Sequence, residues 1–337
     1  MRIRRIITGM FILLYVASMS YVSISGPYAE PDEQQDPPPK PALTLDDLIP
    51  EGSRRDNRTS LSVLFDEEIR EMTMERYLIG VVAAEMPASF EREALKAQAV
   101  AARTNALHSI HINQKIRHPE ANVCTDHTCC TAYYDDERLQ EAWGNNYDVF
   151  ILKIISAVID TDGLHISYNN QPIQAVFHSS SNGMTESGGN VWSDNPPYLR
   201  SVHSPETAED VPDFVVTVDL TYDEFTETFL DEYPGAIFED DPNDWFADIE
   251  YTESGRIYGV TIGGIPIRGT QFRRLFDLRS TFITFEIYGE HISLTTTGFG
   301  HGVGMSQYGA NVMAQQGIAF RDILRAYYFG IIVRTFE

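Results

Sequence analysis

Glu85 is the carboxylate whose sequence context is best suited to acid–base chemistry. It follows the apolar residues Val-Val-Ala-Ala of positions 81–84, and Pro87 stands two positions later. A carboxyl group among apolar neighbours loses hydration, which raises its pKa toward the range where it can hold and deliver a proton near neutral pH. We therefore expect Glu85 to act as a general acid.

Two predicted helices would position this carboxylate. Residues 71–86 repeat apolar side chains at three- and four-residue steps, and Pro87 prevents continuation. Ser89 is a suitable N-cap for a second helix, whose alanine-rich part at 95–107 has no glycine or proline.

Lys96 and Arg103 lie seven residues apart on this second helix and therefore on one face. They form either a solvated edge of the helix or a positive wall beside Glu85. Position alone slightly favours the solvated edge.

Thiols and imidazoles are concentrated in the loop that follows. Such side chains suit tetrahedral zinc, although the spacing contains no paired CxxC. The alternative is one disulfide and one inert thiol, and the residues alone leave both interpretations open. The cluster consists of His118, Cys124, Asp126, His127, Cys129 and Cys130.

Polar residues follow two short strands expected at 158–168 and 173–177. The sequence His-Ser-Ser-Ser-Asn-Gly of 178–183 offers hydrogen-bonding groups, and Trp192 and Tyr198 follow. Polar donors beside flat rings suit a sugar, whereas a satisfied turn with core aromatics is the simpler alternative. A serine nucleophile is not favoured, because the chain has no Gly-x-Ser-x-Gly elbow.

Glycines alternate with other residues at 297–310, where backbone amides could approach a ligand closely. The segment lacks the Lys-Ser/Thr of a phosphate loop and the spacing of a dinucleotide-binding motif, which argues against nucleotide binding. A final helix at 320–328 would pack this loop in place.

Charge and composition restrict the partners. The 337 residues carry 25 basic and 49 acidic side chains, a formal net charge of -24, and 43% hydrophobic content indicates a folded chain. A phosphate backbone would be repelled over most of such a surface, so we expect no nucleic-acid partner.

The N-terminus predicts export. A basic stretch at 1–5 precedes an uncharged one at 6–29, so residues 1–26 are expected to form a single-pass membrane anchor with the rest of the chain outside. A cleavable signal peptide ending near Ser25 is the alternative. Residues 27–58, rich in proline and acidic side chains, are expected to be a linker.

The expected fold of residues 59–337 is α+β, with helices packed on mixed or mainly antiparallel strands. Residues at about 205–290 alternate strand and helix patterns without obvious chemistry, which suggests an inserted, variable lobe.

Motifs at 77–87, 95–103, 177–183, 195–199 and 300–309 together resemble the stage II sporulation protein D family, which includes relatives described as amidase enhancers. The resemblance implies a peptidoglycan lytic transglycosylase that cleaves MurNAc-GlcNAc β-1,4 linkages of glycan strands during sporulation engulfment and forms 1,6-anhydroMurNAc. It also implies a location at the engulfing mother-cell membrane, facing the forespore. The implied partners are the amidase/endopeptidase stage II sporulation protein P and the membrane protein stage II sporulation protein M.

The resemblance also implies roles for particular residues. Activity is assigned to Glu85, Lys96, Arg103 and Tyr198. Substrate binding is expected from His178, Ser179, Ser180, Asn182, Trp192, His301, Ser306 and Gln307. Zinc would be held by His118, Cys124 and Cys130, whereas Cys129 departs from the family pattern, because relatives often carry histidine there.

One carboxylate is sufficient for this reaction, because the C6 hydroxyl of the same sugar is the attacking group. Two alternatives remain. A non-catalytic wall-binding activator of an amidase would create no anhydro ends. A zinc-dependent cell-wall hydrolase is less favoured, since the chain has no HExxH-like helix and thiol-rich ligation is more usual in structural sites.

Overall fold

The computed structural model of the chain describes residues 44–112 and 118–336. The membrane anchor expected at 1–26 and the first part of the expected linker lie outside these residues. Within the two described ranges, no helix has both the length and the apolar composition needed to cross a bilayer.

The last part of the expected linker is folded, so the predicted start of the domain at residue 59 is wrong. Two short helices, α1 (Leu45–Leu48) and α2 (Arg55–Arg58), precede the first strand. Leu45 is fully buried in the core, and its backbone N–H donates to Asp136 at 2.9 Å. The proline-rich and acidic composition of this segment predicts a linker and gives no sign of these few anchoring contacts.

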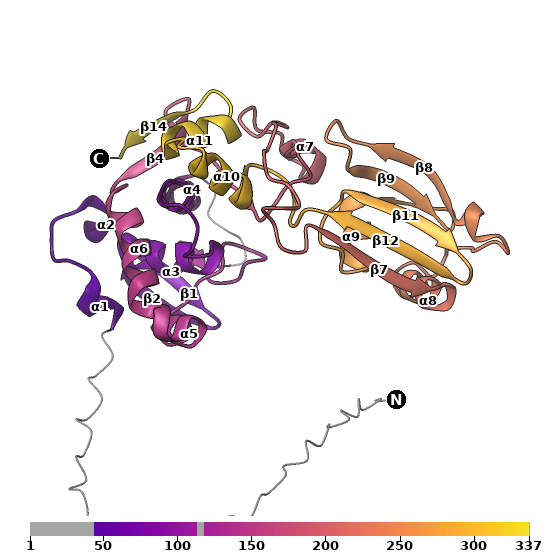
Figure 1. Cartoon of the computed structure of the whole chain (residues 1–337), viewed down its shortest axis with the longest axis horizontal. Helices are drawn as coiled ribbons and strands as arrows, with labels where there is room; N and C mark the ends of the chain where they lie inside the picture. The colour runs from indigo at the N-terminus through magenta and orange to yellow at the C-terminus, as the bar shows by residue number, and fades with distance from the viewer. Residues whose placement is uncertain (1–43, 113–117, 337) are drawn as a thin grey trace, which may run out of the picture. The chain divides into compact units, whose positions relative to one another are not determined.

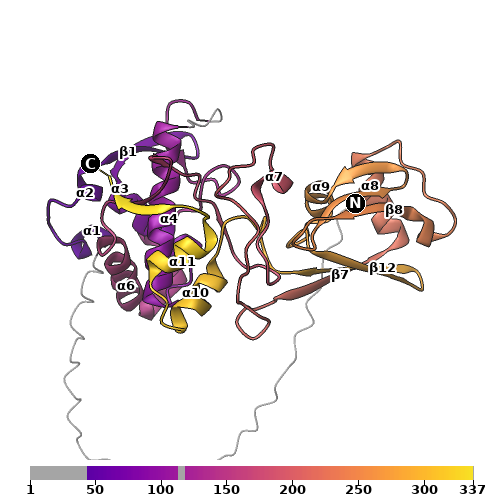
Figure 2. The ribbon, with the colours of Figure 1, turned by 90° about the horizontal axis from the view of Figure 1, so that it is seen from above.

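Helix α4 is the centre of the part that carries Glu85. It packs against α3, α6, α10 and α11 (Figures 1 and 2). Its alanines are buried, and their small side chains let the neighbouring helices approach closely. The helices here are α3 (Met74–Glu85), α4 (Arg92–His111), α5 (Asp136–Trp143), η1 (Gly144–Asn146), α6 (Tyr147–Ile159), α10 (Gln307–Gln315) and α11 (Phe320–Tyr327).

Three small sheets accompany these helices. The first has order β2-β1-β3, the second β14-β4-β5, and the third is the parallel pair β13-β6. The third pairs Phe177 with Met305 and His178 with Ser306, which brings the His178 segment beside the glycine-rich segment. Their strands are β1 (Ser60–Phe65), β2 (Glu68–Thr73), β3 (Val123–Cys124), β4 (Leu164–Tyr168), β5 (Gln171–Pro172), β6 (Phe177–His178), β13 (Met305–Ser306) and β14 (Ile332–Thr335).

A second hydrophobic core lies within the predicted variable lobe. Phe225, Phe229 and Phe272 are fully buried in it, and the rings of Phe225 and Phe276 stack with centroids 4.6 Å apart. Antiparallel sheets of order β11-β12-β7 and β10-β9-β8 surround it. After α7 (Gly188–Val191), its elements are β7 (Val215–Thr221), α8 (Tyr222–Glu232), η2 (Pro242–Trp245), β8 (Phe246–Tyr251), β9 (Ile257–Ile262), β10 (Ile265–Arg268), α9 (Gly269–Leu275), β11 (Ile283–Tyr288) and β12 (His291–Thr297).

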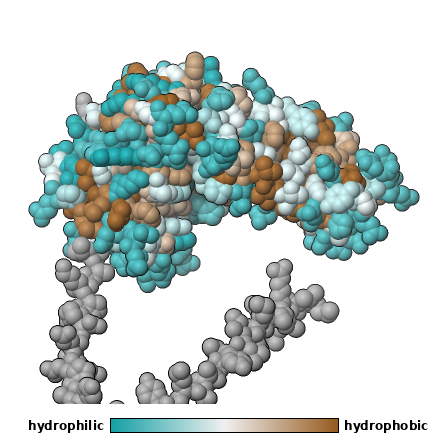
Figure 3. Space-filling model, viewed as in Figure 1, coloured by the Kyte–Doolittle hydropathy of each residue, from teal (hydrophilic) through white to brown (hydrophobic). Residues whose placement is uncertain are grey.

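The described residues therefore form an α+β fold with several small, mainly antiparallel sheets, as expected. The face drawn in Figure 3 is mainly hydrophilic with scattered hydrophobic areas, in keeping with the high net charge.

Several predicted boundaries are wrong. Helix α3 begins at Met74, because Thr73 caps it by accepting from the Arg76 N–H at 3.2 Å. Helix α4 begins at Arg92 and not after Ser89. The strand expected from residue 158 begins only at Leu164, since helix α6 extends through Ile159. The strand expected at 173–177 is largely irregular, with β6 starting at its last residue.

Candidate active site

The Glu85 carboxylate stands at the C-terminal end of helix α3 and lines a pocket of about 400 Å³. Its Oε1 accepts from the backbone N–H of Ala132 at 2.9 Å, and its Oε2 accepts from Gln307 Nε2 at 3.3 Å. Burial raises the pKa of Glu85, while these two hydrogen bonds act in the opposite direction. Glu85 is thus half-buried beside a pocket, with a raised pKa, as its sequence context predicts.

A larger side pocket, of about 760 Å³, adjoins the Glu85 pocket. The two share part of their lining, and we call them together the Glu85 groove. Glu85 is the single carboxylate among the described residues that line either pocket. The shared lining consists of Asn105, His127, Cys130, Val176 and His301.

His178 is buried in the wall of the Glu85 pocket. Its Nδ1 lies 3.1 Å from the Val303 carbonyl, which can only accept, so Nδ1 carries the proton and Nε2 accepts from the Ser181 hydroxyl at 2.7 Å. Burial lowers the pKa of His178 well below its usual value. The ring is therefore neutral near pH 7, with its proton on Nδ1.

His301 brings the glycine-rich segment into the groove. Burial lowers the pKa of His301 to about 4, with a further contribution from the charge of Arg273. Its Nδ1 accepts from the Val303 N–H at 3.1 Å. The Trp192 ring, which lines the side pocket, lies 5.0 Å from the His301 ring. An imidazole and an indole thus meet at the groove, an arrangement suited to a sugar.

The polar residues expected to bind substrate separate into two groups. Ser179 and Gln307 line the Glu85 pocket, as do His178 and His301. Ser180 is buried beneath it, paired through its backbone with Phe299 at 3.0 and 2.9 Å. Asn182 donates through Nδ2 to the Ser254 carbonyl at 3.1 Å. Ser180 and Asn182, both expected to bind substrate, are not among the described residues that line either pocket, and they are placed to support the wall.

Ser306 is also buried behind the pocket, where it caps helix α10 and binds a second carboxylate. Glu206 Oε1 accepts from the Ser306 hydroxyl at 2.5 Å and from the Ser181 N–H at 2.6 Å. A Cβ at Gly309 would overlap this carboxylate. Glu206 thus joins the His178 loop to the N-terminus of α10, and so positions Gln307.

Tyr198 does not line either pocket of the groove among the described residues. Its hydroxyl accepts from the Gln174 N–H at 3.1 Å, and its ring packs 5.6 Å from that of Tyr168. Burial raises the pKa of Tyr198. Tyr198 therefore supports the segment before β6. Through this segment it holds Gln174, which lines the side pocket.

Lys96 is not placed at Glu85. Its Nζ lies 2.8 Å from Glu93 and 3.3 Å from Asp160, and Lys96 is absent from the described lining of the groove. The positive wall considered from the sequence is wrong for this residue, since two other carboxylates neutralise it.

Arg103 is fully buried and forms an ion pair with Asp56, which is 1% exposed; the shortest N–O distance is 2.6 Å. Further bonds go to the Leu164 carbonyl at 3.0 Å and the Val158 carbonyl at 3.4 Å. Arg103 therefore ties α4 to α2, α6 and β4. Arg103 is thus neither a solvated edge of the helix nor a positive wall beside Glu85. Its partner, Asp56, lies 47 positions earlier in the chain, and no local pattern in the sequence joins the two.

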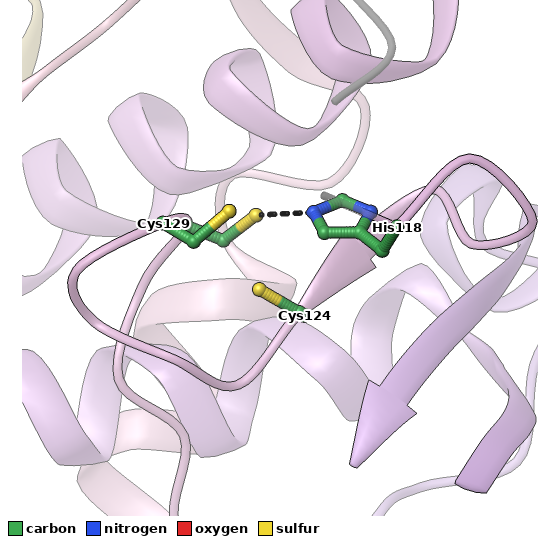
Figure 4. Close-up of side chains that lie close together, drawn as sticks. His118, Cys124 and Cys129 are labelled. Atoms are coloured by element: carbon green, nitrogen blue, oxygen red, sulfur yellow. Dashed lines mark hydrogen bonds between the residues drawn. The ribbon is translucent and has the colours of Figure 1, made fainter. Parts of the chain in front are cut away.

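The loop residues expected to bind metal converge, and Cys129 joins them (Figure 4). One ligand atom from each of His118, Cys124, Cys129 and Cys130 lies within 4.8 Å of the others. No disulfide links the three cysteines in the described part of the chain. The hydrogen bond from Cys130 lowers the pKa of Cys124, which favours a thiolate at this position.

This donor set fits zinc. Zn–S bonds of about 2.3 Å place two thiolates of a tetrahedral site roughly 3.8 Å apart, and the four donor atoms here all lie within 4.8 Å of one another. His118 Nδ1 donates to the Ala121 carbonyl at 3.0 Å, which leaves Nε2, 3.3 Å from Cys130 Sγ, with its lone pair toward the thiols. Four protein ligands would complete a tetrahedron and leave no open position, as in structural sites.

Several groups at the site carried no clear sequence signal. The Ala132 donor is a backbone N–H, which no side-chain pattern reveals. Asn105 faces the groove from a helix whose other residues are mostly buried. Cys129 belongs to the cluster seen in the sequence, but the resemblance left it out of the ligand set, and only its convergence with His118, Cys124 and Cys130 adds it.

Comparison with known proteins gives the family. Residues 66–168 match the family model described as stage II sporulation protein. The chain is 37% identical to stage II sporulation protein D of Bacillus subtilis (strain 168), over 79% of this chain and 75% of that protein. Identity is also 37% to stage II sporulation protein D of Bacillus amyloliquefaciens, with the same coverage. The chain therefore belongs to the stage II sporulation protein D family.

A more distant similarity joins it to a second kind of protein. The chain is 26% identical to the amidase enhancer of Bacillus subtilis (strain 168), over 77% of this chain and 40% of that protein.

Proposed function

We propose that this protein is a peptidoglycan lytic transglycosylase that cleaves MurNAc-GlcNAc β-1,4 linkages and uses Glu85 as its only acid–base group. One observation carries the proposal: Glu85, with its raised pKa, is the single carboxylate among the described residues lining the groove. Ordinary glycosidases place two carboxyl groups about 5 to 9.5 Å apart across the scissile bond. A groove with one carboxylate instead suits a reaction whose nucleophile the substrate supplies.

In the first half of the reaction, protonated Glu85 donates its proton to the glycosidic oxygen, and the bond from that oxygen to C1 of MurNAc breaks. The leaving GlcNAc departs with a free 4-hydroxyl. The Ala132 N–H and the Gln307 amide then bind the carboxylate that Glu85 has become. These donors are in place before the reaction, so they stabilise the charge without reorganisation.

In the second half, the C6 hydroxyl of the same MurNAc attacks C1, and Glu85 accepts its proton. The product is the 1,6-anhydro sugar, and Glu85 is protonated again. Because the hydroxyl belongs to the same ring, its effective concentration is high and no activated water is required. Neutral His178 and His301 would shape the wall of the pocket without adding positive charge beside the acid.

Zinc held by His118, Cys124, Cys129 and Cys130 would have a structural part in this proposal. The metal would cross-link the loop that also provides the Ala132 N–H and the groove residues His127 and Thr131. No chemical step passes through it. The closed ligand set weighs against the zinc-hydrolase alternative.

Family membership supports the biological setting as a proposal: action during engulfment at the mother-cell membrane, together with stage II sporulation protein P and stage II sporulation protein M. Co-purification of the full-length chain with each partner from sporulating cells would test it. Recovery of the full-length chain without either partner would contradict this setting.

The deciding experiment treats purified, peptide-free glycan strands with the protein and with Glu85→Gln, and analyses the products by mass spectrometry. We expect anhydro ends from the wild type and none above background from the variant. Anhydro ends made by Glu85→Gln would refute the mechanism. The similarity to the amidase enhancer favours one rival, a non-catalytic wall-binding activator of an amidase. In that case the wild type and Glu85→Gln would both bind glycan and stimulate an amidase, and neither would produce anhydro ends.

A further inference from the structure

The side pocket of the Glu85 groove has a cationic wall that the acid–base mechanism does not use. Arg273 and Arg274, both from helix α9 of the second core, line it together with Trp192. No acidic residue is among its described lining residues. In a chain with 49 acidic and 25 basic residues, a pocket lined by two arginines and no carboxylate departs from the general surface charge.

Arg273 is held with its charge available to a ligand. Its Nε donates to the Leu278 carbonyl at 3.0 Å, which fixes the base of the guanidinium group. No ion pair of Arg273 is found within residues 44–112 and 118–336. The Arg273 guanidinium is half-buried, and this desolvation lowers its pKa, although the charge of Asp277 acts in the opposite direction. A partly desolvated cation binds an anion more strongly than a solvated one.

Arg274 adds a second, more accessible charge. It is 72% exposed, and its contact with Glu232 is a long one, at 3.5 Å between two exposed groups. Such an exposed pair contributes little and can be given up to a ligand. Together the two adjacent arginines offer the planar donors that recognise carboxylates.

The neighbouring aromatic residue indicates which anion would bind. The Trp192 ring is 37% exposed in the same pocket and could stack on a sugar face. An aromatic surface beside paired arginines suits an acidic saccharide better than a free inorganic anion. This step depends on the proposed function, because it assumes that a glycan occupies the groove.

We propose that Arg273 and Arg274 form a subsite that binds a carboxylate carried by the glycan strand next to the linkage cleaved at Glu85. Two sources share this chemistry. One is the lactyl carboxylate of a muramyl residue without a peptide, and the other is a carboxylate of an attached peptide. The second core would thereby take part in substrate selection, although it contributes no acid or base to the reaction.

Binding measurements on a Glu85→Gln background test the subsite separately from catalysis. Isothermal titration calorimetry would compare three ligands of equal length: peptide-free glycan, peptide-bearing glycan, and a chitooligosaccharide without carboxylates. Adding Arg273→Gln and Arg274→Gln together should weaken binding of a carboxylate-bearing ligand by about tenfold or more. Affinity for the chitooligosaccharide should change by less than about twofold, because that ligand offers no anion.

The three ligands also identify the source. A loss for peptide-free glycan indicates the lactyl carboxylate, whereas a loss confined to peptide-bearing glycan indicates the peptide. An equal loss for the chitooligosaccharide, or no loss for either carboxylate-bearing ligand, would overturn the subsite.

Two controls keep the result interpretable. Arg325→Gln removes a comparably exposed arginine from helix α11 and should alter no affinity. If the double variant unfolds, Arg274→Gln alone is judged by the same comparison, since its side chain is mostly solvated. Should Glu85→Gln prove active, the proposed mechanism fails while the charge-dependent binding is still decided.

Discussion

Gln307 donates its side-chain Nε2 to Glu85 Oε2 at 3.3 Å, across 222 positions of the sequence. Gln307 is the first residue of α10 and Glu85 the last of α3, so this contact joins two helix ends at the groove. The capping of α10 by Ser306, itself bound to Glu206, determines where the amide lies.

Removing this amide should alter the pH dependence of the reaction. The bond favours the charged form of Glu85, so Gln307→Leu should raise the pKa of Glu85 further. Because the acid must be protonated to act, the alkaline limb of kcat/KM against pH should move upward. Gln315→Leu, an exposed glutamine at the end of the same helix, is the matched control. An unchanged or lowered alkaline limb in Gln307→Leu would contradict the assignment.

Arg103 should prove essential for stability and not for chemistry. Arg103→Ala leaves Asp56 buried without its partner, which typically costs about 3–5 kcal/mol of unfolding free energy. On the same helix, Arg92→Ala breaks a more exposed pair with Asp160 and should cost about 1 kcal/mol or less. Urea unfolding measures both.

Activity per folded molecule separates the two roles of Arg103. We expect residual activity of Arg103→Ala to follow its folded fraction. A fully folded variant without activity would show that Arg103 acts in the reaction itself.

Loss of a zinc ligand should lower both the zinc content and the stability of the protein. We expect one zinc per chain by elemental analysis, and Cys129→Ser should lower both zinc content and melting temperature, since it removes one of four ligands. His127→Ala, in the same loop but not among the four converging side chains, should retain the metal. Unchanged zinc content in Cys129→Ser would restrict the ligands to the three residues inferred from the resemblance.

His301 should make the folded state less stable in acid. Its folded pKa is about 4, below the usual 6.5, so between these values the unfolded chain binds more protons. This contribution to the unfolding free energy is therefore fully present above pH 6.5 and is lost as pH falls toward 4. His301→Gln should weaken this dependence in urea unfolding at a series of pH values.

The same series contains its own control. At pH 7.5 the imidazole is neutral in both states, so the difference between wild type and His301→Gln there reports packing alone. If the two curves stay parallel down to pH 4, the burial of a neutral His301 is wrong.

Much of the site could be predicted from local sequence. The apolar context of Glu85 implied burial and a raised pKa, because neighbours along a helix remain neighbours in the fold. The density of thiols and imidazoles at 118–130 indicated either a metal site or a disulfide, and four of these side chains converge without a disulfide in the described residues. The strand and helix patterns at about 205–290 suggested an inserted lobe, and a second hydrophobic core lies largely within that range.

Other relationships are decided by packing between distant segments. The sequence left Arg103 as either a solvated edge or a positive wall beside Glu85, yet it lies buried against Asp56, within the residues expected to be a linker. Lys96 shares its helix face and instead pairs with Glu93 and Asp160. Spacing on a helix determines which side chains share a face, whereas the partner of that face depends on how the other helices pack.

The sequence by itself determined the apolar context of Glu85, the concentration of thiols and imidazoles at 118–130 and the family resemblance. Only the tertiary structure decided that the Ala132 N–H and Gln307 bind Glu85, that Cys129 converges with His118, Cys124 and Cys130, and that the lobe contributes Arg273 and Arg274 to the groove. The physical reason is that backbone donors and long-range contacts leave no local pattern. They exist only after the hydrophobic cores have brought remote segments together.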